Sequence, residues 1–262
     1  MTAHHIRYEV DADGIATVTI DRAEKRNAMT YAMLGAFISK VAEAGADENV
    51  RVLIVTGSGG AFCAGTDLAD LASVPGETRG VRGEAHQAGV WWPLVSCPKP
   101  VIGAIDGVAV GMGAEFTSQC DVRIISDRAR FAWNFAHRGL VPDTGAGSWL
   151  LPRLIGPHRA LRLLYSGEFL HAEEAKAIGY AAEVVAPEAL AETAVAEARR
   201  YLNSSPFSLR HMKSLVWKGL ERDLGEHMTV HVETMKACFK SEDHKEGVAA
   251  FLERRPAKFT GR

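Results

Sequence analysis

Residues 106–115 read DGVAVGMGAE, and residues 61–68 read AFCAGTDL. Each segment mixes glycine with other small residues and follows a continuous apolar run, at 101–105 and 52–55, as long as a strand covered on both faces. Small residues allow other groups to come close to the backbone of such segments. For any one glycine taken alone, a tight turn or close helix packing would be a sufficient explanation. Neither segment has the GxGxxG or GxxxxGK[ST] spacing, so nicotinamide and nucleoside-triphosphate chemistry lose their main support.

Apolar periodicity predicts strands alternating with helices over the first 200 residues. Residues 15–20 alternate as a half-buried strand does, and Thr30 precedes a stretch with one apolar helical face. Further strand-like runs lie at 122–125 and 182–185. After Ser204-Ser205-Pro206, three segments read as helices with apolar faces, 207–218, 222–241 and 243–254. We therefore predict an α/β core over residues 1–200 and a C-terminal α-helical subdomain over residues 201–262.

Composition indicates a globular protein whose partners bind at local sites. The chain has 262 residues, 47% of them hydrophobic, and 30 basic residues nearly balance 32 acidic ones. Neither sign forms a run suited to nucleic acid or an anionic membrane, so we expect no nucleic-acid or membrane partner. The four cysteines form no CxxC pair and the ten histidines no HExxH motif, which argues against structural zinc or another metal site. With no signal-like N-terminus, a cytoplasmic location is expected.

The residue patterns of the two glycine-rich segments resemble those of the crotonase (enoyl-CoA hydratase/isomerase) superfamily. There the first reads roughly AF-x-AG-x-D, and the second reads N/DG-x-A-x-G-x-G, followed two residues later by a carboxylate. The resemblance spans nearly the whole chain, since it also includes DRAEKRNAM at 21–29, GLVPD at 139–143, LPRLIG at 151–156 and the segment 241–261. It implies a crotonase-like spiral of β-β-α turns, with C-terminal helices that mediate assembly as a homotrimer or hexamer.

The same resemblance implies an acyl-CoA thioester as the partner, with coenzyme A belonging to the substrate and no other cofactor. Family members hold the thioester oxygen with two backbone N–H groups, at positions that match Thr66 and Met112. Preorganised donors stabilise the negative charge of the enolate, and Met112 stands where a helix should begin. The positions matching coenzyme A contacts are Lys25, Arg26, Ala64, Asp67, Leu68, Lys258 and Phe259.

Hydratases of the superfamily use two glutamates. Glu115 matches the first, but Phe135 occupies the second position, which puts simple two-glutamate hydration in doubt. Several isomerases of the superfamily place a working aspartate eight residues later, where this chain has Asp143. Because moving a double bond requires only a base and an acid, we predict Glu115 and Asp143 as the catalytic pair. Phe135 and Trp92 are the candidates for the acyl pocket.

Other interpretations of these residues remain open at this point. Without the family, Glu115 would read as a carboxylate near a helix N-terminus and Asp143 as a turn residue. A non-catalytic acyl-CoA binding protein is one alternative, because a fold does not guarantee its chemistry. Trp91, Trp92 and Asp143 also resemble the chlorobenzoyl-CoA dehalogenase branch. Pro93 stands where that branch has its histidine, which makes an acyl-CoA dehalogenase or hydrolase the weaker alternative.

Overall fold

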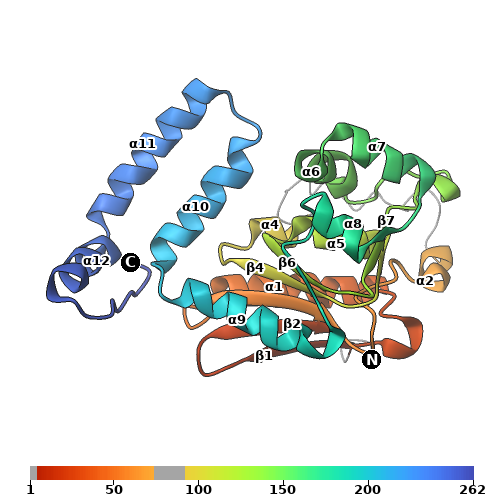
Figure 1. The fold of residues 1–262 in the computed structure, drawn as a ribbon, viewed down its shortest axis with the longest axis horizontal. Coiled ribbons are helices and arrows are strands. Elements are labelled where there is room, and N and C mark those ends of the chain that lie inside the picture. The colour runs from red at the N-terminus through yellow and green to blue at the C-terminus, as the bar shows by residue number, and fades with distance from the viewer. Residues whose placement is uncertain (1–4, 74–91) are drawn as a thin grey trace.

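The computed structural model describes residues 5–73 and 92–262 (Figure 1). Its strands are β1 (Ile6–Val10), β2 (Ile15–Ile20), β3 (Val52–Gly57), β4 (Val101–Ile105), β5 (Val108–Val110), β6 (Val122–Ser126), β7 (Arg130–Ala132), β8 (Leu170–His171) and β9 (Glu183–Val185). Its α-helices are α1 (Tyr31–Ala46), α2 (Leu68–Ser73), α4 (Pro93–Ser96), α5 (Met112–Gln119), α6 (Ala146–Ile155), α7 (Pro157–Ser166), α8 (Ala172–Ala177), α9 (Leu190–Leu202), α10 (Pro206–Gly219), α11 (Leu224–Lys240) and α12 (Glu242–Glu253). Short 3-10 helices lie at Ala23–Lys25, Ala136–Arg138 and Pro187–Ala189.

Two sheets share the strands of the core. The larger has the order β1-β2-β3-β4-β6-β9 and is parallel except for the β1–β2 hairpin. The smaller has the order β5-β7-β8. The chain alternates between them, because β4 and β6 belong to the large sheet while β5 and β7, which follow them directly, belong to the small one. This alternation, with α5 after β5, gives the predicted spiral of β-β-α turns.

The predicted buried strands are confirmed, and the packing on both sheet faces explains their continuous apolar runs. Successive side chains of a strand point to opposite faces. One face, including Ile54 and Ile102, packs against α9, which lies along the sheet in Figure 1. The other face, including Leu53 and Ile105, belongs to the main core under α1 and α5. Since both faces are covered, neither needs polar residues.

Helix α1 begins where the sequence predicts. Thr30 is its N-cap, and the Thr30 hydroxyl accepts a hydrogen bond from the Met33 amide at 3.2 Å. The buried positions Met33, Phe37 and Val41 recur at helical spacing and face the core. The capping residue and the apolar stripe therefore orient this helix, whose first turns also border the cavity described below.

The C-terminal helices α10, α11 and α12 extend away from the sheets, with α10 and α11 side by side (Figure 1). Helix α10 is joined to the core through Asp121, which accepts from Trp217 Nε1 at 2.8 Å and pairs with Lys213 Nζ at 2.7 Å. No residue of α10 or α11 is buried in the single chain. The domain boundary at residue 200 stays a prediction; α9 continues to Leu202, and α10 begins at Pro206.

None of the helices in the described ranges has the length and apolar character needed to cross a bilayer.

The two glycine-rich segments lie against each other. The Cys63 carbonyl accepts from the Val110 amide at 2.9 Å, and the Cys63 amide donates to the Val108 carbonyl at 3.0 Å. Gly113 packs so closely that a Cβ placed on it would lie 2.2 Å from the Cys63 carbonyl oxygen. Residues 62–63 therefore pair with β5 and bring both segments to one place.

We expect Gly113→Ala to lower the free energy of unfolding by about 1–3 kcal/mol, because the added methyl group forces backbone apart. Gly35→Ala is the matched control, since a Cβ at this exposed helical glycine has no neighbour within 4 Å. The control should be neutral or stabilising by up to about 1 kcal/mol. Urea unfolding of both variants measures the difference, and equal midpoints would contradict the close approach.

Candidate active site

A cavity of about 700 Å³ lies where the glycine-rich segments meet. Its walls come from four stretches of chain: the first turns of α1, residues 64–71, residues 110–116 and residues 134–144. Much of the lining is apolar, including Leu34, Phe116 and Phe135. Asp143 and Thr144 add polar groups on one side. A largely apolar cavity with a few convergent polar groups is typical of a site for a small organic ligand.

Two residues whose backbone amides have no acceptor among the described residues line this cavity. Thr66 forms a parallel bridge with Met29, but the residues on either side of Thr66 make the hydrogen bonds. The Gly65 carbonyl accepts from the Met29 amide, and the Asp67 amide donates to the Met29 carbonyl. Among the described residues, the Thr66 amide has no acceptor. Met112 is the first residue of α5, so its N–H has no intrahelical acceptor. Both residues line the cavity, and a Cβ on Gly65 would lie 3.9 Å from the Met112 nitrogen.

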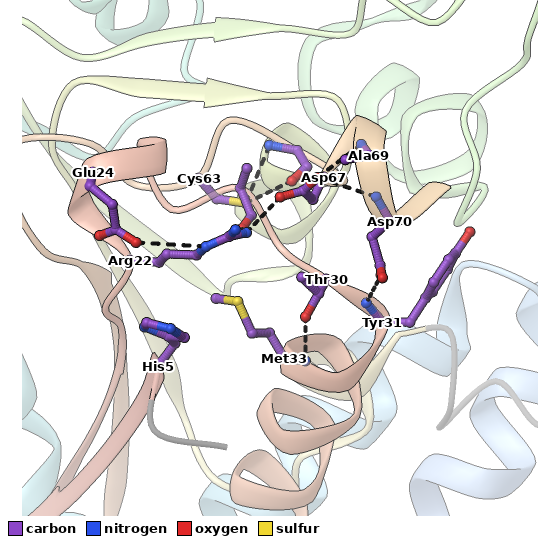
Figure 2. A network of polar contacts seen from close by, with 12 residues as sticks. His5, Arg22, Glu24, Thr30, Tyr31, Met33, Cys63, Asp67, Ala69 and Asp70 are labelled. Carbon is purple, nitrogen blue, oxygen red and sulfur yellow. Dashed lines mark hydrogen bonds and ion pairs between the residues drawn. The ribbon is translucent and has the colours of Figure 1, made fainter. Parts of the chain in front are cut away.

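A polar network holds the segment that carries Thr66 (Figure 2). Arg22 Nη1 donates to Asp67 Oδ2 at 2.7 Å and to the Ala28 carbonyl at 3.1 Å. Asp67 Oδ1 in turn accepts from the Ala69 amide at 2.9 Å and from the Asp70 amide at 3.3 Å, at the start of α2. The hydrogen bond from Arg22 holds the pKa of Asp67 below its usual value. The Thr66 amide is therefore set in place by groups on both sides of it.

Asn27 anchors the segment 21–29 from the other side. Its side chain is fully buried, and Nδ2 donates to the carbonyls of Ser58 and Ala61 at 2.9 and 2.7 Å. Its Oδ1 accepts from the Arg22 amide at 2.8 Å. Sequence reasoning used 21–29 only as part of a resemblance and missed the roles of Asn27 and Arg22. The sequence feature that could have revealed them is the presence of these two polar residues in a segment flanked by apolar elements.

The predicted coenzyme A contacts fall into two groups. Lys25 and Arg26 are exposed beside Ala64, whose amide donates to the Arg26 carbonyl at 3.0 Å, and Leu68 opens α2 at the cavity. Lys258 and Phe259 lie apart from these, in the C-terminal region. There the Lys258 amide donates to Glu246 at 2.6 Å, and the Phe259 ring packs near Gly247. Within one chain, only Ala64 and Leu68 of these predicted contacts line the cavity. Arg26 touches that segment through its carbonyl, and Lys258 and Phe259 lie elsewhere.

Glu115 is placed by α5 behind the cavity wall. It is fully buried, its Oε2 accepts from the Thr144 hydroxyl at 2.7 Å, and its Oε1 has no hydrogen-bond partner among the described residues. Burial raises the pKa of Glu115 to about 8, and the charge of Asp143 acts in the same direction. The Thr144 hydrogen bond and the nearby amides of Gly147 and Ala146 oppose this rise. The surroundings of Glu115 therefore favour its neutral form.

Asp143 and Thr144 form the cavity wall in front of Glu115. They follow Pro142 in the loop that leads into α6, and α6 begins at Ala146 immediately after Gly145. The structure thus brings the predicted pair Glu115 and Asp143 together, with Asp143 at the surface of the cavity and Glu115 one layer behind. Thr144, which the sequence analysis did not single out, lies between Glu115 and the cavity.

The two predicted acyl-pocket residues are placed differently. Phe135 is 8% exposed and lines the cavity. Trp92 instead donates from Nε1 to the Thr144 carbonyl at 2.9 Å and supports the loop from outside the cavity lining. Trp91 lies outside the described residues. Within residues 5–73 and 92–262, no group of three or more histidine, cysteine or acidic side chains is arranged to hold a metal ion.

Comparisons with known proteins identify the class to which this fold and site belong. The sequence model for Enoyl-CoA hydratase/isomerase matches residues 11–262, so the chain belongs to the enoyl-CoA hydratase/isomerase family, the crotonase superfamily. It is an enzyme family of lyases and isomerases.

Individual relatives resemble the chain over nearly its whole length. A "Probable enoyl-CoA hydratase" of Rhodobacter capsulatus is 35% identical over 262 residues, covering 100% of both chains. The 1,2-epoxyphenylacetyl-CoA isomerase of Escherichia coli is 34% identical over 252 residues, covering 95% of this chain and 96% of the relative. Among solved structures, an enoyl-CoA hydratase subunit I from Geobacillus kaustophilus superposes with a TM-score of 0.89 at 33% identity, covering 98% of each chain.

We expect Asp67→Asn to lower the free energy of unfolding by about 1–3 kcal/mol, because it removes a charge-assisted hydrogen bond between two largely buried side chains. Glu233→Gln is the matched control, since it breaks an exposed ion pair with Lys236 that should contribute nothing measurable. Urea unfolding compares the two variants. If both behaved alike, Asp67 would not brace the segment that carries Thr66.

Proposed function

We propose that this chain moves a carbon–carbon double bond in an acyl-CoA thioester through an enolate held by the amides of Thr66 and Met112. The observation that carries the proposal is the pair of carboxyl groups at one wall of the cavity, Asp143 at its surface and neutral Glu115 behind. Phe135 supports isomerisation over hydration, because it stands where a hydratase carries its second glutamate. The similarity to a relative named 1,2-epoxyphenylacetyl-CoA isomerase points the same way.

Electrostatics would drive the first step. When a base takes the proton from the carbon next to the thioester, the electron pair moves onto the thioester oxygen. Two preorganised N–H donors facing that oxygen stabilise the charge, and one such donor contributes about 3–4 kcal/mol in comparable sites. The positive end of the α5 dipole, at Met112, adds to this effect. The amides act here, so the side chains of Thr66 and Met112 matter less.

The two carboxyl groups divide the acid and base work. Ionised Asp143 takes a proton from one carbon, and neutral Glu115 supplies a proton to the other end of the delocalised system. Transfer of a proton from Asp143 to Glu115 then restores the starting state. The product has the same mass as the substrate, because no water is consumed. A site of this kind requires no metal or redox group, only placement and electrostatics.

The coenzyme A moiety would lie across the rim formed by Lys25, Arg26, Ala64, Asp67 and Leu68. The exposed cations Lys25 and Arg26 suit the phosphates, while the Asp67 carboxylate acts indirectly, since it is engaged with Arg22 and α2. Lys258 and Phe259 belong to the C-terminal subdomain, which we propose to be the oligomerisation unit of a cytoplasmic homotrimer or hexamer. Large apolar side chains exposed there, such as Phe239 and Phe251, support that assembly.

We expect Asp143→Asn to lower kcat on the best substrate at least tenfold with little change in thioester affinity, as for an acid/base group. A panel of 2-enoyl-, 3-enoyl- and dienoyl-CoA thioesters, with products identified by mass, provides the assay. Asp127→Asn, at an exposed position in the turn after β6, is the control and should leave turnover unchanged. An isobaric product supports isomerisation, and a product heavier by one water makes hydration the reaction instead. Thioester binding without turnover would favour a carrier.

A pH profile tests the role of neutral Glu115. Its pKa is raised to about 8, so the protonated form that donates is present below that value and is lost as pH rises through it. We expect kcat/KM to fall above about pH 8 in the native enzyme. Glu115→Gln should be slower throughout and should lack this alkaline limb. An unchanged limb in Glu115→Gln would assign it to another group.

A further inference from the structure

The wall of the cavity next to Glu115 has two layers. Glu115 is fully buried, and the Thr144 side chain that hydrogen-bonds to it belongs to a residue lining the cavity. The Thr144 hydroxyl is therefore the described side-chain group that links the Glu115 carboxyl to a residue of the cavity wall. No other described side chain makes a hydrogen bond to the Glu115 carboxyl.

We infer that Thr144 is a positioning residue that connects the buried Glu115 carboxyl to the substrate, presenting its hydroxyl to the cavity as a donor only when Glu115 is protonated. The inference rests on the proposed function, because it assigns the path by which Glu115 acts. Its basis is the geometry of the hydroxyl, which has one proton to donate and two positions at which it can accept.

The hydrogen bonds around Thr144 Oγ1 account for this behaviour. The Ala146 amide donates to Oγ1 at 3.3 Å, and the Glu115 oxygen lies 2.7 Å away. With Glu115 ionised, the only hydroxyl proton of Thr144 is held by the carboxylate. With Glu115 neutral and its proton on Oε2, the carboxyl donates instead, and both acceptor positions of Oγ1 are filled. The Thr144 proton is then free to point into the cavity.

The backbone around Thr144 is held in place independently of this hydrogen bond. Its carbonyl accepts from Trp92 Nε1 at 2.9 Å, and the Gly145 amide closes a turn onto Pro142 at 3.2 Å. Gly147 lets α6 pack against the carboxyl, because a Cβ there would lie 2.5 Å from Glu115 Oε1. The hydroxyl is thus fixed relative to Glu115, as relay through a single side chain requires.

The groups that face Glu115 set its pKa, and therefore the pH range in which Thr144 can donate to the cavity. Asp143, in the same loop as Thr144, disfavours the carboxylate, as does burial. The N-terminal amides of α6 and the Thr144 hydroxyl favour it. Trp133, the residue after β7, also lies beside Gly147 at this carboxyl, and it carries no charge. Removing the hydroxyl therefore removes a group that favours the charged form, and the pKa of Glu115 should rise.

The experiment compares Thr144→Ser, which keeps a hydroxyl, with Thr144→Val and Thr144→Ala, which remove it. Carbon-13 NMR of glutamate-labelled protein, with Glu115→Gln to assign the signal, follows the titration of Glu115 without any need for turnover. Turnover is measured with the thioester that the native enzyme converts fastest. Thr229→Val, on an exposed stretch of α11, is the control for the loss of a threonine hydroxyl.

We expect Thr144→Ser to keep turnover within about threefold, and Thr144→Val and Thr144→Ala to lose at least about tenfold. In the last two, the pKa of Glu115 should rise by about one pH unit, as for loss of a hydrogen bond to a charged group. Glu115→Gln combined with Thr144→Val should be no slower than Glu115→Gln alone, because the two residues act as a unit.

Three results would overturn the inference: an unchanged Glu115 titration without the hydroxyl, a loss of turnover in Thr144→Ser equal to that in Thr144→Val, or additive losses in the double variant. Failure of the proposed function looks different. In that case the native enzyme converts none of the thioesters, while the NMR titrations of Thr144→Ser and Thr144→Val still decide whether the hydroxyl governs Glu115.

Discussion

The pairing of residues 62–63 with strand β5 is the contact on which the site depends. Hydrogen bonds between Cys63 and residues 108 and 110 bring the two glycine-rich segments into register. Gly113 permits the approach because it has no side chain to hold the Cys63 carbonyl away. As a result the free amide of Thr66 and the first amide of α5 reach the same cavity. Local backbone geometry, more than any single side chain, places these two amides together, and the proposed oxyanion site rests on that placement.

A buried carboxyl group is the second constraint on this site. Isolating Glu115 from water disfavours its charge, and only a hydroxyl and a few amides offset that cost. The unfilled Oε1 shows that the surroundings do not fully solvate a carboxylate. Such an arrangement weakens the fold in the ionised state and suits a group that must hold a proton near neutral pH. Asp143, one layer nearer the cavity, is exposed and lacks this isolation, which is consistent with the base role proposed for it.

Long and strongly patterned elements were predictable from the sequence. Strands β3 and β4 are buried on both faces, so their runs contain no charged residue, and β6 keeps this pattern except at the buried Arg123. Helix α1 is marked by the Thr30 cap and a helical stripe. The strands of the small sheet were not predicted, because β5, β7 and β8 have only two or three residues each. Runs so short have no measurable period. Their pairing is decided by neighbours that lie far away in the chain.

By itself the sequence determined the class of protein, through the resemblance of its two glycine-rich segments to the crotonase superfamily, and that resemblance predicted Thr66, Met112, Glu115 and Asp143 as site residues. Only the tertiary structure decided how these groups are layered. It placed Thr144 between Glu115 and the cavity, moved Trp92 to a supporting contact, and joined Arg22 to Asp67 across 45 residues. The physical reason is that hydrogen bonds and burial depend on distances in space, which residue types and local spacing do not encode.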